Sequence, residues 1–106
     1  LVTMNVGPEA EFFIFKQDEE GNATTHTYDK AGYYSAAPVD KGEKLRRIMV
    51  KTLKEMGFEV EASHHEVARG QHEMDFKYAD ALTTADNIMT FKYAVTAIAE
   101  QNGAVA

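Results

Sequence analysis

The chain has 106 residues, enough for one small domain and too few for two, and its composition (44% hydrophobic, 26% charged, two prolines) excludes a disordered or low-complexity chain. A net charge of −6 argues against nucleic acid or an anionic membrane surface as a partner, because both would repel an acidic protein. The absence of cysteine excludes disulfides and thiolate metal sites, and it favours a reducing, cytoplasmic location.

The first half of the chain predicts a hairpin and then a helix. Apolar and acidic residues alternate over 9–15, and a threonine-rich return strand over 23–28 follows the turn-forming residues 18–22, which together predict a hairpin over 8–28. After a loop over 29–38, Asp40 is the expected N-cap of a helix that ends at Gly57. Its basic residues, including Arg46, are expected on the solvated face, and its apolar stripe comprises Leu45, Ile48, Met49, Thr52, Leu53 and Met56.

The second half predicts two further strands and a longer helix. Alternation over 58–63 and over 71–76 is typical of strands, which a loop over 64–70 connects. Asp80 is expected to open a helix that ends at 102–103 and whose apolar residues include Leu82 and Met89. The order β-β-α-β-β-α favours an α+β domain: an antiparallel sheet of about four strands with two helices on one face.

The two ends of the chain resemble cuts through a longer protein. Residues 1–6 form an apolar stretch with no preceding cap or turn, and residues 103–106 resemble the start of a further strand directly after a helix stop. We therefore expect residues 1–106 to form a single partial domain.

Acidic residues are predicted to gather on the sheet face opposite the helices. The strand period of two places these residues there: Glu9, Glu11, Glu59, Glu61, Glu73 and Asp75. Glu66, in the loop between the last two strands, is close enough to lean over the same surface. Like charges on neighbouring strands destabilise a sheet, whereas a hard cation such as Mg²⁺ or Mn²⁺ would turn that repulsion into binding. The alternative is an ordinary solvated acidic face.

The histidines do not form a recognisable motif on their own. A zinc-protease motif that starts at His65 would need a second histidine at position 69, which is Arg69. His64 and His65 are therefore interpreted as surface residues of the loop, and His72, on the apolar side of its strand, as a hydrogen-bonded core histidine. The sequence also contains no glycine-rich phosphate loop and no Gly-x-Ser-x-Gly nucleophile motif.

Two acidic segments resemble bacterial type I glutamine synthetase. Residues 7–13 (GPEAEFF) are similar to that family's GPEPEFF strand, and residues 61–68 (EASHHEVA) with 70–73 (GQHE) are similar to its next metal-binding segment. Residues 32–34, 37–40 and 56–58 follow in the family's order and spacing, so the resemblance spans nearly the whole chain. The sequence departs from the family at Ala10, which replaces a proline, and at Arg69, which adds a cation beside the acidic residues.

The resemblance implies a function and a set of site residues. The family joins ammonia to glutamate with ATP through γ-glutamyl phosphate, using Mg²⁺ or Mn²⁺. By motif position, Glu11, Glu66 and Glu73 would hold one ion and Glu9 would contribute to a second. Glu61 matches a nucleotide-binding position, and Tyr33 matches a position near the ammonium and glutamate pocket.

The resemblance also sets the expected extent of the protein. Family chains are several times longer and assemble as dodecamers, so residues 1–106 correspond to the N-terminal portion of the catalytic domain and are expected to be inactive alone. Two alternatives stay open: another carboxylate–amine ligase of the same superfamily, and a non-catalytic metal-binding module.

Overall fold

A computed structural model describes residues 2–106, and Leu1, the first residue of the predicted apolar stretch, lies outside them. Within the described residues, the helices are α1 (Glu43–Glu55) and α2 (Ala81–Gln101). The strands are β1 (Asn5–Val6), β2 (Glu9–Phe13), β3 (Phe15–Gln17), β4 (Ala23–Thr27), β5 (Val60–His65), β6 (Gln71–Phe76), β7 (Ala79–Asp80) and β8 (Ala104–Val105). Neither helix is long and apolar enough to cross a membrane.

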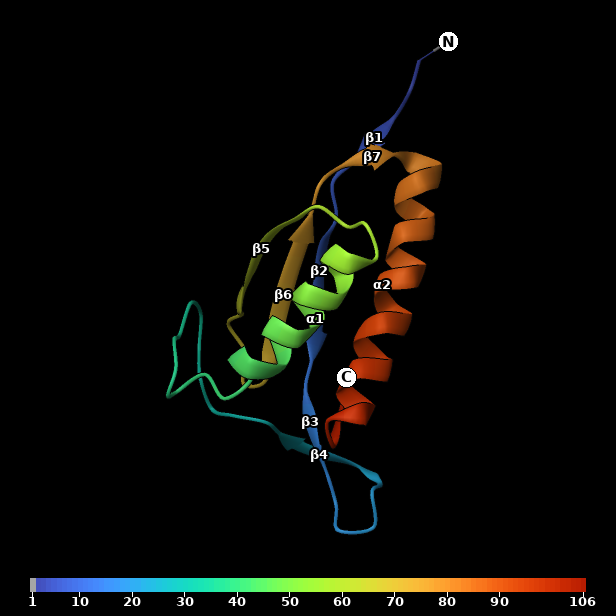
Figure 1. The fold of residues 1–106 in the computed structure, drawn as a ribbon. Coiled ribbons are helices and arrows are strands. Elements are labelled where there is room, and N and C mark those ends of the chain that lie inside the picture. The colour runs from blue at the N-terminus through green and yellow to red at the C-terminus, as the bar shows by residue number, and fades with distance from the viewer. Residues whose placement is uncertain (1) are drawn as a thin grey trace.

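The strands pair antiparallel, which confirms the predicted α+β class. A three-stranded sheet has the order β2-β6-β5, a second has the order β4-β3-β8, and β1 pairs with β7. The strands of the described residues are thus distributed over three small sheets rather than one sheet of about four. Figure 1 shows β2 and β3 as successive parts of one path that runs behind α1 and towards the β3–β4 hairpin.

Ile14 is the residue at which the predicted first strand divides. It is fully buried, its N–H donates to the carbonyl of Gly70 at 2.8 Å, and its carbonyl accepts from the N–H of Tyr28 at 3.0 Å. Before Ile14 the chain pairs with β6, and after it the chain pairs with β4 and β8. The predicted hairpin over 8–28 is therefore wrong in extent, because only β3 and β4 form it.

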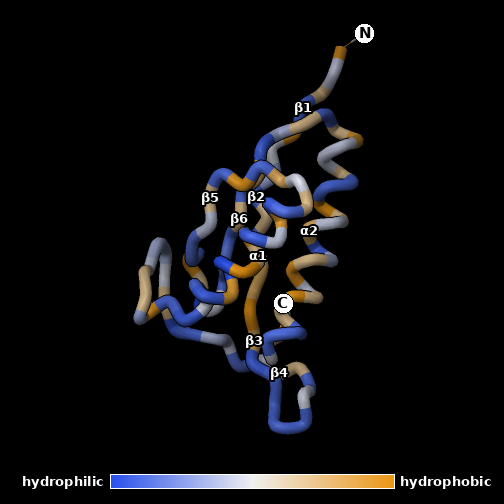
Figure 2. Tube along the Cα trace, in the orientation of Figure 1, coloured by the Kyte–Doolittle hydropathy of each residue, from blue (hydrophilic) through white to orange (hydrophobic). Residues whose placement is uncertain are grey.

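Both helices pack on the same side of the β2-β6-β5 sheet, as predicted. The core joins residues of α1 and α2 to inward-facing residues of β6 and to Ile14; its largest members include Leu45, Met49, Leu53, Met74, Phe76, Phe91, Val95 and Ile98. Figure 2 shows hydrophilic residues at the tip of the β3–β4 hairpin, away from this core.

The apolar residues predicted along the helices are not all buried. Leu45, Met49 and Leu53 of α1 lie in the core, but Ile48 and Met56 from the same predicted stripe are exposed. On α2, Leu82 is 75% and Met89 is 65% exposed. Helix α2 is apolar on more than one face, so its sequence alone did not distinguish the buried face from the exposed one.

The start of α1 corrects two expectations. Gly42 rather than Asp40 occupies the N-cap position, and no side chain caps the helix there. Asp40 instead accepts a hydrogen bond from Arg46 Nη2 at 2.7 Å, and both side chains are buried. Arg46 is therefore inside the protein and not on the solvated face, because its guanidinium has a buried carboxylate to pair with. The predicted cap of α2 is confirmed, since Asp80 accepts from the N–H of Thr83.

Alanine substitutions at two glycines with positive φ compare a tightly packed position between the sheets with an open one. A Cβ at Gly70 (φ 68°) would lie 2.9 Å from Cβ of Thr27 and 3.1 Å from the carbonyl oxygen of Ile14, whereas a Cβ at Gly21 (φ 84°) would meet nothing within 4 Å. We expect Gly21→Ala to lower the free energy of unfolding by about 1–2 kcal/mol from backbone strain. Gly70→Ala should lower it by about 1–3 kcal/mol more because of overpacking. Urea unfolding of both variants measures the difference, and equal losses would contradict it.

Candidate metal site

The register of the central sheet sorts its side chains into two faces. Glu9 lies opposite Asp75, and Glu11 lies opposite Glu73, so these four carboxylates share one face. On the other face, Ala10 and Phe12 lie opposite Met74 and His72 and meet the helices. The structure thus places four of the predicted acidic residues together, on the side away from the core.

A bulge in β5 changes which of its residues join that face. Val60 pairs with Phe76 but Ala62 pairs with Asp75, so Glu61 is an extra residue without a partner in β6. Beyond the bulge every side chain is on the face opposite to the one that strict alternation predicts. Ala62 therefore faces the carboxylates rather than the helices, and Ser63 lies opposite Met74 and accepts from Arg46 Nε at 3.3 Å.

The same bulge brings His64 among the acidic residues. His64 lies opposite Glu73; its Nε2 is 3.6 Å from Glu73 Oε2, and its Nδ1 is 3.7 Å from Glu66 Oε1. Ligand atoms of His64, Glu66 and Glu73 all lie within 4.8 Å of one another. Strand alternation did not place His64 on this face, because the alternating pattern carries no sign of the bulge. Only the position of His64 next to the acidic segment pointed to this histidine.

In the described part of the chain, the carboxylates of this cluster lie close together with no positive side chain to balance their charge. Burial, hydrogen bonding with Asp75 and Glu66, and repulsion by their charges raise the pKa of Glu73 to about 8. Asp75 also has a buried oxygen, Oδ1, with no hydrogen-bond partner among the described residues. A divalent cation would relieve both features.

The donor set fits a hard cation. Ligand atoms around one Mg²⁺ ion lie at most about 4.2 Å apart, twice a metal–oxygen distance of about 2.1 Å. One ring nitrogen of His64 and one oxygen each of Glu66 and Glu73 lie within 4.8 Å of one another, which is close to that limit, so small side-chain shifts would bring them around one ion. Carboxylate oxygens suit Mg²⁺ and Mn²⁺, and Glu66 and Glu73 are largely withdrawn from water.

The remaining predicted site residues lie around this cluster but not in it. Glu11 is exposed, and its Oε2 accepts from Gln71 Nε2 at 2.6 Å. Glu9 and Glu61 are exposed as well. Glu59 precedes β5 opposite Lys77, and its carboxylate pairs with the Lys77 ammonium at 3.2 Å, so its charge is compensated there.

Tyr33 lies in the loop that precedes α1, next to the cluster. Its ring centroid is 4.6 Å from that of Tyr34 and 5.9 Å from that of His64, and the Tyr34 ring stacks on His64 at 4.5 Å. The Tyr34 N–H also donates to the carbonyl of His65 at 3.0 Å. Both tyrosines are more than half exposed, so a small molecule beside the cluster could reach them.

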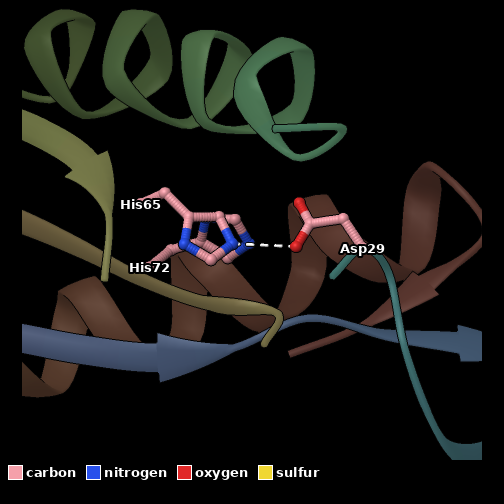
Figure 3. Close-up of side chains that lie close together, drawn as sticks. All are labelled: Asp29, His65 and His72. Atoms are coloured by element: carbon pink, nitrogen blue, oxygen red, sulfur yellow. Dashed lines mark hydrogen bonds and ion pairs between the residues drawn. The ribbon is translucent and has the colours of Figure 1, made fainter. Parts of the chain in front are cut away.

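A second, fully buried polar group lies behind the carboxylate face. His65 Nε2 donates to Asp29 Oδ1 at 2.8 Å, as Figure 3 shows, and His65 Nδ1 lies 2.6 Å from the carbonyl oxygen of Glu66. The prediction that His65 is a surface residue is therefore wrong, because the bulge turns its side chain inward. Burial raises the pKa of Asp29, but the hydrogen bonds from His65 and from the N–H groups of Ala31 and Lys41 outweigh that effect and hold it below the usual value.

His72 confirms the prediction of a hydrogen-bonded core histidine. Arg46 Nη1 lies 2.9 Å from its Nδ1 and must donate, because a guanidinium has no acceptor. Burial, followed by the nearby Arg46 charge, lowers the pKa of His72 to about 4, so the ring is neutral near pH 7.

Asp29, His65 and His72 have metal-ligand spacing but do not suit a metal ion. Their ligand atoms lie within 4.8 Å of one another. However, Arg46 occupies Nδ1 of His72, so the proton of the neutral ring is on Nε2, which then has no lone pair for a metal. Both nitrogens of His65 already face acceptors, and the Arg46 charge would repel a cation. The three residues instead belong to two separate hydrogen-bonded sets, Asp29–His65 and Asp40–Arg46–His72.

Fold and site together define an α+β module with a crowded carboxylate face, and comparison with known proteins identifies its family. The model of the glutamine synthetase catalytic domain matches residues 1–106. Glutamine synthetase of Clostridium saccharobutylicum is 68% identical over 101 residues, which cover 95% of this chain and 23% of that protein. Glutamine synthetase of Thermus thermophilus is 65% identical over 97 residues, covering 92% of this chain and 22% of that protein.

Solved structures show the same fold. A structure described as a GmaS/ADP complex superposes with a TM-score of 0.80 at 30% identity, covering 97% of this chain and 24% of that chain. The cryo-EM structure of Plasmodium falciparum glutamine synthetase gives a TM-score of 0.79 at 26% identity, covering 97% of this chain and 26% of that chain.

The chain belongs to the glutamine synthetase catalytic-domain family, which confirms the resemblance found in its sequence. It spans less than a quarter of the length of the curated relatives named above.

The raised pKa of Glu73 predicts an unusual titration of the metal-free chain. Its carboxyl group should lose its proton around pH 8 rather than near 4.5. Because the folded state holds this proton more tightly, the unfolded state binds fewer protons between these pH values, and the free energy of unfolding should fall as pH rises through that window. Carbon-13 NMR of the glutamate carboxyls measures the titration.

Two variants separate this effect from the remaining acidic groups. Glu73→Gln should remove this part of the pH dependence of unfolding, whereas Glu20→Gln, at an exposed position in the hairpin turn, should leave it in place. Titration of Glu73 below pH 6 would contradict the prediction.

Proposed function

We propose that this chain supplies part of the divalent-metal site of an ATP-dependent ligase that condenses glutamate and ammonia to glutamine through γ-glutamyl phosphate. The observation that carries the proposal is the crowded carboxylate face, where Glu73 has a raised pKa and Asp75 has an orphaned oxygen. Membership of the glutamine synthetase family supplies the reaction class.

Each site residue has a role in this proposal. Glu11, Glu66 and Glu73 would hold one Mg²⁺ or Mn²⁺ ion, and Glu9 would contribute to a second. Glu11 would have to turn from Gln71 towards Glu73, which lies directly opposite on β6. When bound, the ions would offset the charge of the ATP phosphates and of the phosphoryl group in transfer.

The neighbouring residues would place the substrates beside the ions. Glu61 would contact the nucleotide, and its position in the bulge keeps its side chain exposed for that contact. Tyr33 would line the ammonium and glutamate pocket from the loop before α1. The Tyr34 ring, stacked on His64, would cover one side of the metal cluster and reduce its contact with water.

The parent protein would be larger than this chain. We infer that residues 1–106 form the N-terminal portion of a catalytic domain, because the curated relatives are more than four times as long as the matched segment. The parent would act in the cytoplasm as a homo-dodecamer on small molecules, and the groups that clamp glutamate and the nucleotide would lie outside this chain.

Calorimetric titration with Mn²⁺ tests the proposed metal site directly. The chain should bind Mn²⁺ saturably, and a triple variant with Glu11, Glu66 and Glu73 changed to alanine should lose that binding. The matched control changes the exposed Glu19, Glu20 and Glu55 to alanine, which removes the same number of carboxyl groups and should retain the binding. Equal binding by the two triple variants, with both folded by circular dichroism, would contradict the assignment.

The chain alone should not make glutamine. Incubated with glutamate, ammonium, ATP and Mg²⁺, the purified chain is expected to yield no glutamine above a protein-free blank, since this chain carries only part of the proposed site. Chromatographic assay for glutamine measures the outcome. Sustained turnover that the Glu73→Ala variant abolishes would show that the missing segments are dispensable.

A further inference from the structure

Asp29 is a buried carboxylate with a large set of hydrogen bonds and no contact with the carboxylate face. Its Oδ1 accepts from His65 Nε2 at 2.8 Å and from the N–H groups of Ala31 and Gly70 at 3.2 and 3.3 Å. Its Oδ2 accepts from the N–H of Lys41 at 3.0 Å. Because its side chain is fully buried and accepts several hydrogen bonds, the Asp29 carboxylate is held in one orientation.

The four donors come from two separate segments. Ala31 and Lys41 lie near the two ends of the loop between β4 and α1, so Asp29 closes that loop. His65 and Gly70 lie at the two ends of the connection between β5 and β6. One carboxylate therefore fixes the two segments relative to each other, as Figure 3 shows for its bond to His65.

These two segments carry the residues of the proposed site. The ring of His65 bridges Asp29 and the carbonyl of Glu66, with hydrogen bonds of 2.8 and 2.6 Å, so Asp29 controls the backbone of Glu66 through one rigid ring. The loop before α1 carries Tyr33 and Tyr34, and the Tyr34 ring stacks on His64 at 4.5 Å.

We propose that Asp29 is a positioning residue for the metal site: through the His65 ring it fixes Glu66, and through the N–H groups of Ala31 and Lys41 it fixes the tyrosine loop over His64. The proposal rests on the proposed function, because it assumes that Glu66 is a metal ligand. Asp29 touches neither the metal ligands' carboxylates nor the tyrosine rings. Partners that orient a metal's ligands commonly change its affinity when they are removed.

Three variants of the chain test this role. Asp29→Ala removes all four hydrogen bonds and should weaken Mn²⁺ binding, measured by calorimetry, by about tenfold or more. Asp29→Asn keeps one oxygen for the three donors that share Oδ1 and should bind Mn²⁺ nearly as well as the unchanged chain. Val95→Ala makes a cavity in the α2 core and should lower stability without changing Mn²⁺ affinity.

An NMR measurement gives a readout that does not need metal. In the unchanged chain the Tyr34 ring should shift the His64 ring protons upfield and give nuclear Overhauser contacts with them, because the two rings stack at 11°. Asp29→Ala should lose these signals, whereas Asp29→Asn and Val95→Ala should keep them. If Asp29→Ala does not fold, His65→Gln, which replaces the rigid bridge to the Glu66 carbonyl, should show the same loss of Mn²⁺ affinity.

The outcomes separate this proposal from the proposed function. In folded Asp29→Ala, unchanged Mn²⁺ affinity together with an intact Tyr34–His64 contact would overturn the positioning role while leaving the metal site in place. If Asp29→Ala does not fold, unchanged Mn²⁺ affinity in folded His65→Gln would overturn it. No Mn²⁺ binding by the unchanged chain would count against the metal site, and the NMR contact would then decide whether Asp29 holds the tyrosine loop. A loss of affinity in Val95→Ala as large as in Asp29→Ala would also overturn the proposal, since it would reflect general destabilisation.

Discussion

The inserted residue Glu61 decides which side chains of β5 meet the core and which meet the carboxylates. Upstream of the bulge Val60 packs inward, and downstream of it His65 does, although strict alternation would put positions 60 and 65 on opposite faces because they differ by an odd number. Without the bulge, His64 would face the helices and His65 would lie on the carboxylate face. Both the carboxylate cluster and the buried network behind it therefore depend on this one local irregularity.

The central sheet separates a group of unpaired carboxylates on one face from a group of paired buried carboxylates on the other. On one face, carboxylates lie together without enough positive charge, and burial together with the neighbouring carboxylates raises the pKa of Glu73 to about 8. On the other, Asp29 and Asp40 are each paired with a buried partner, His65 and Arg46. The unpaired face can gain from a cation, whereas each buried carboxylate on the other face already has a partner and can serve to hold the first face in place.

The sequence predicted the elements better than their pairing. Alternation in 9–13 and 71–76 correctly placed Glu9, Glu11, Glu73 and Asp75 on one face, because those strands are regular. It failed at Ile14, where the strand changes partners, and at Glu61, because a bulge depends on tertiary packing and leaves no period in the sequence. Arg46 was misplaced for a related reason, since burying an arginine requires a partner that only the fold supplies.

The hydrogen bonds of Ile14 have a mechanical meaning. Its N–H is bound to the turn that follows Glu66, and its carbonyl is bound to the end of the β3–β4 hairpin, so the two three-stranded sheets share one rigid peptide group on each side of this residue. Rotation of one sheet against the other would break at least one of these bonds within the protein interior. A displacement of the hairpin would therefore be transmitted through Ile14 to the turn beside the carboxylate cluster.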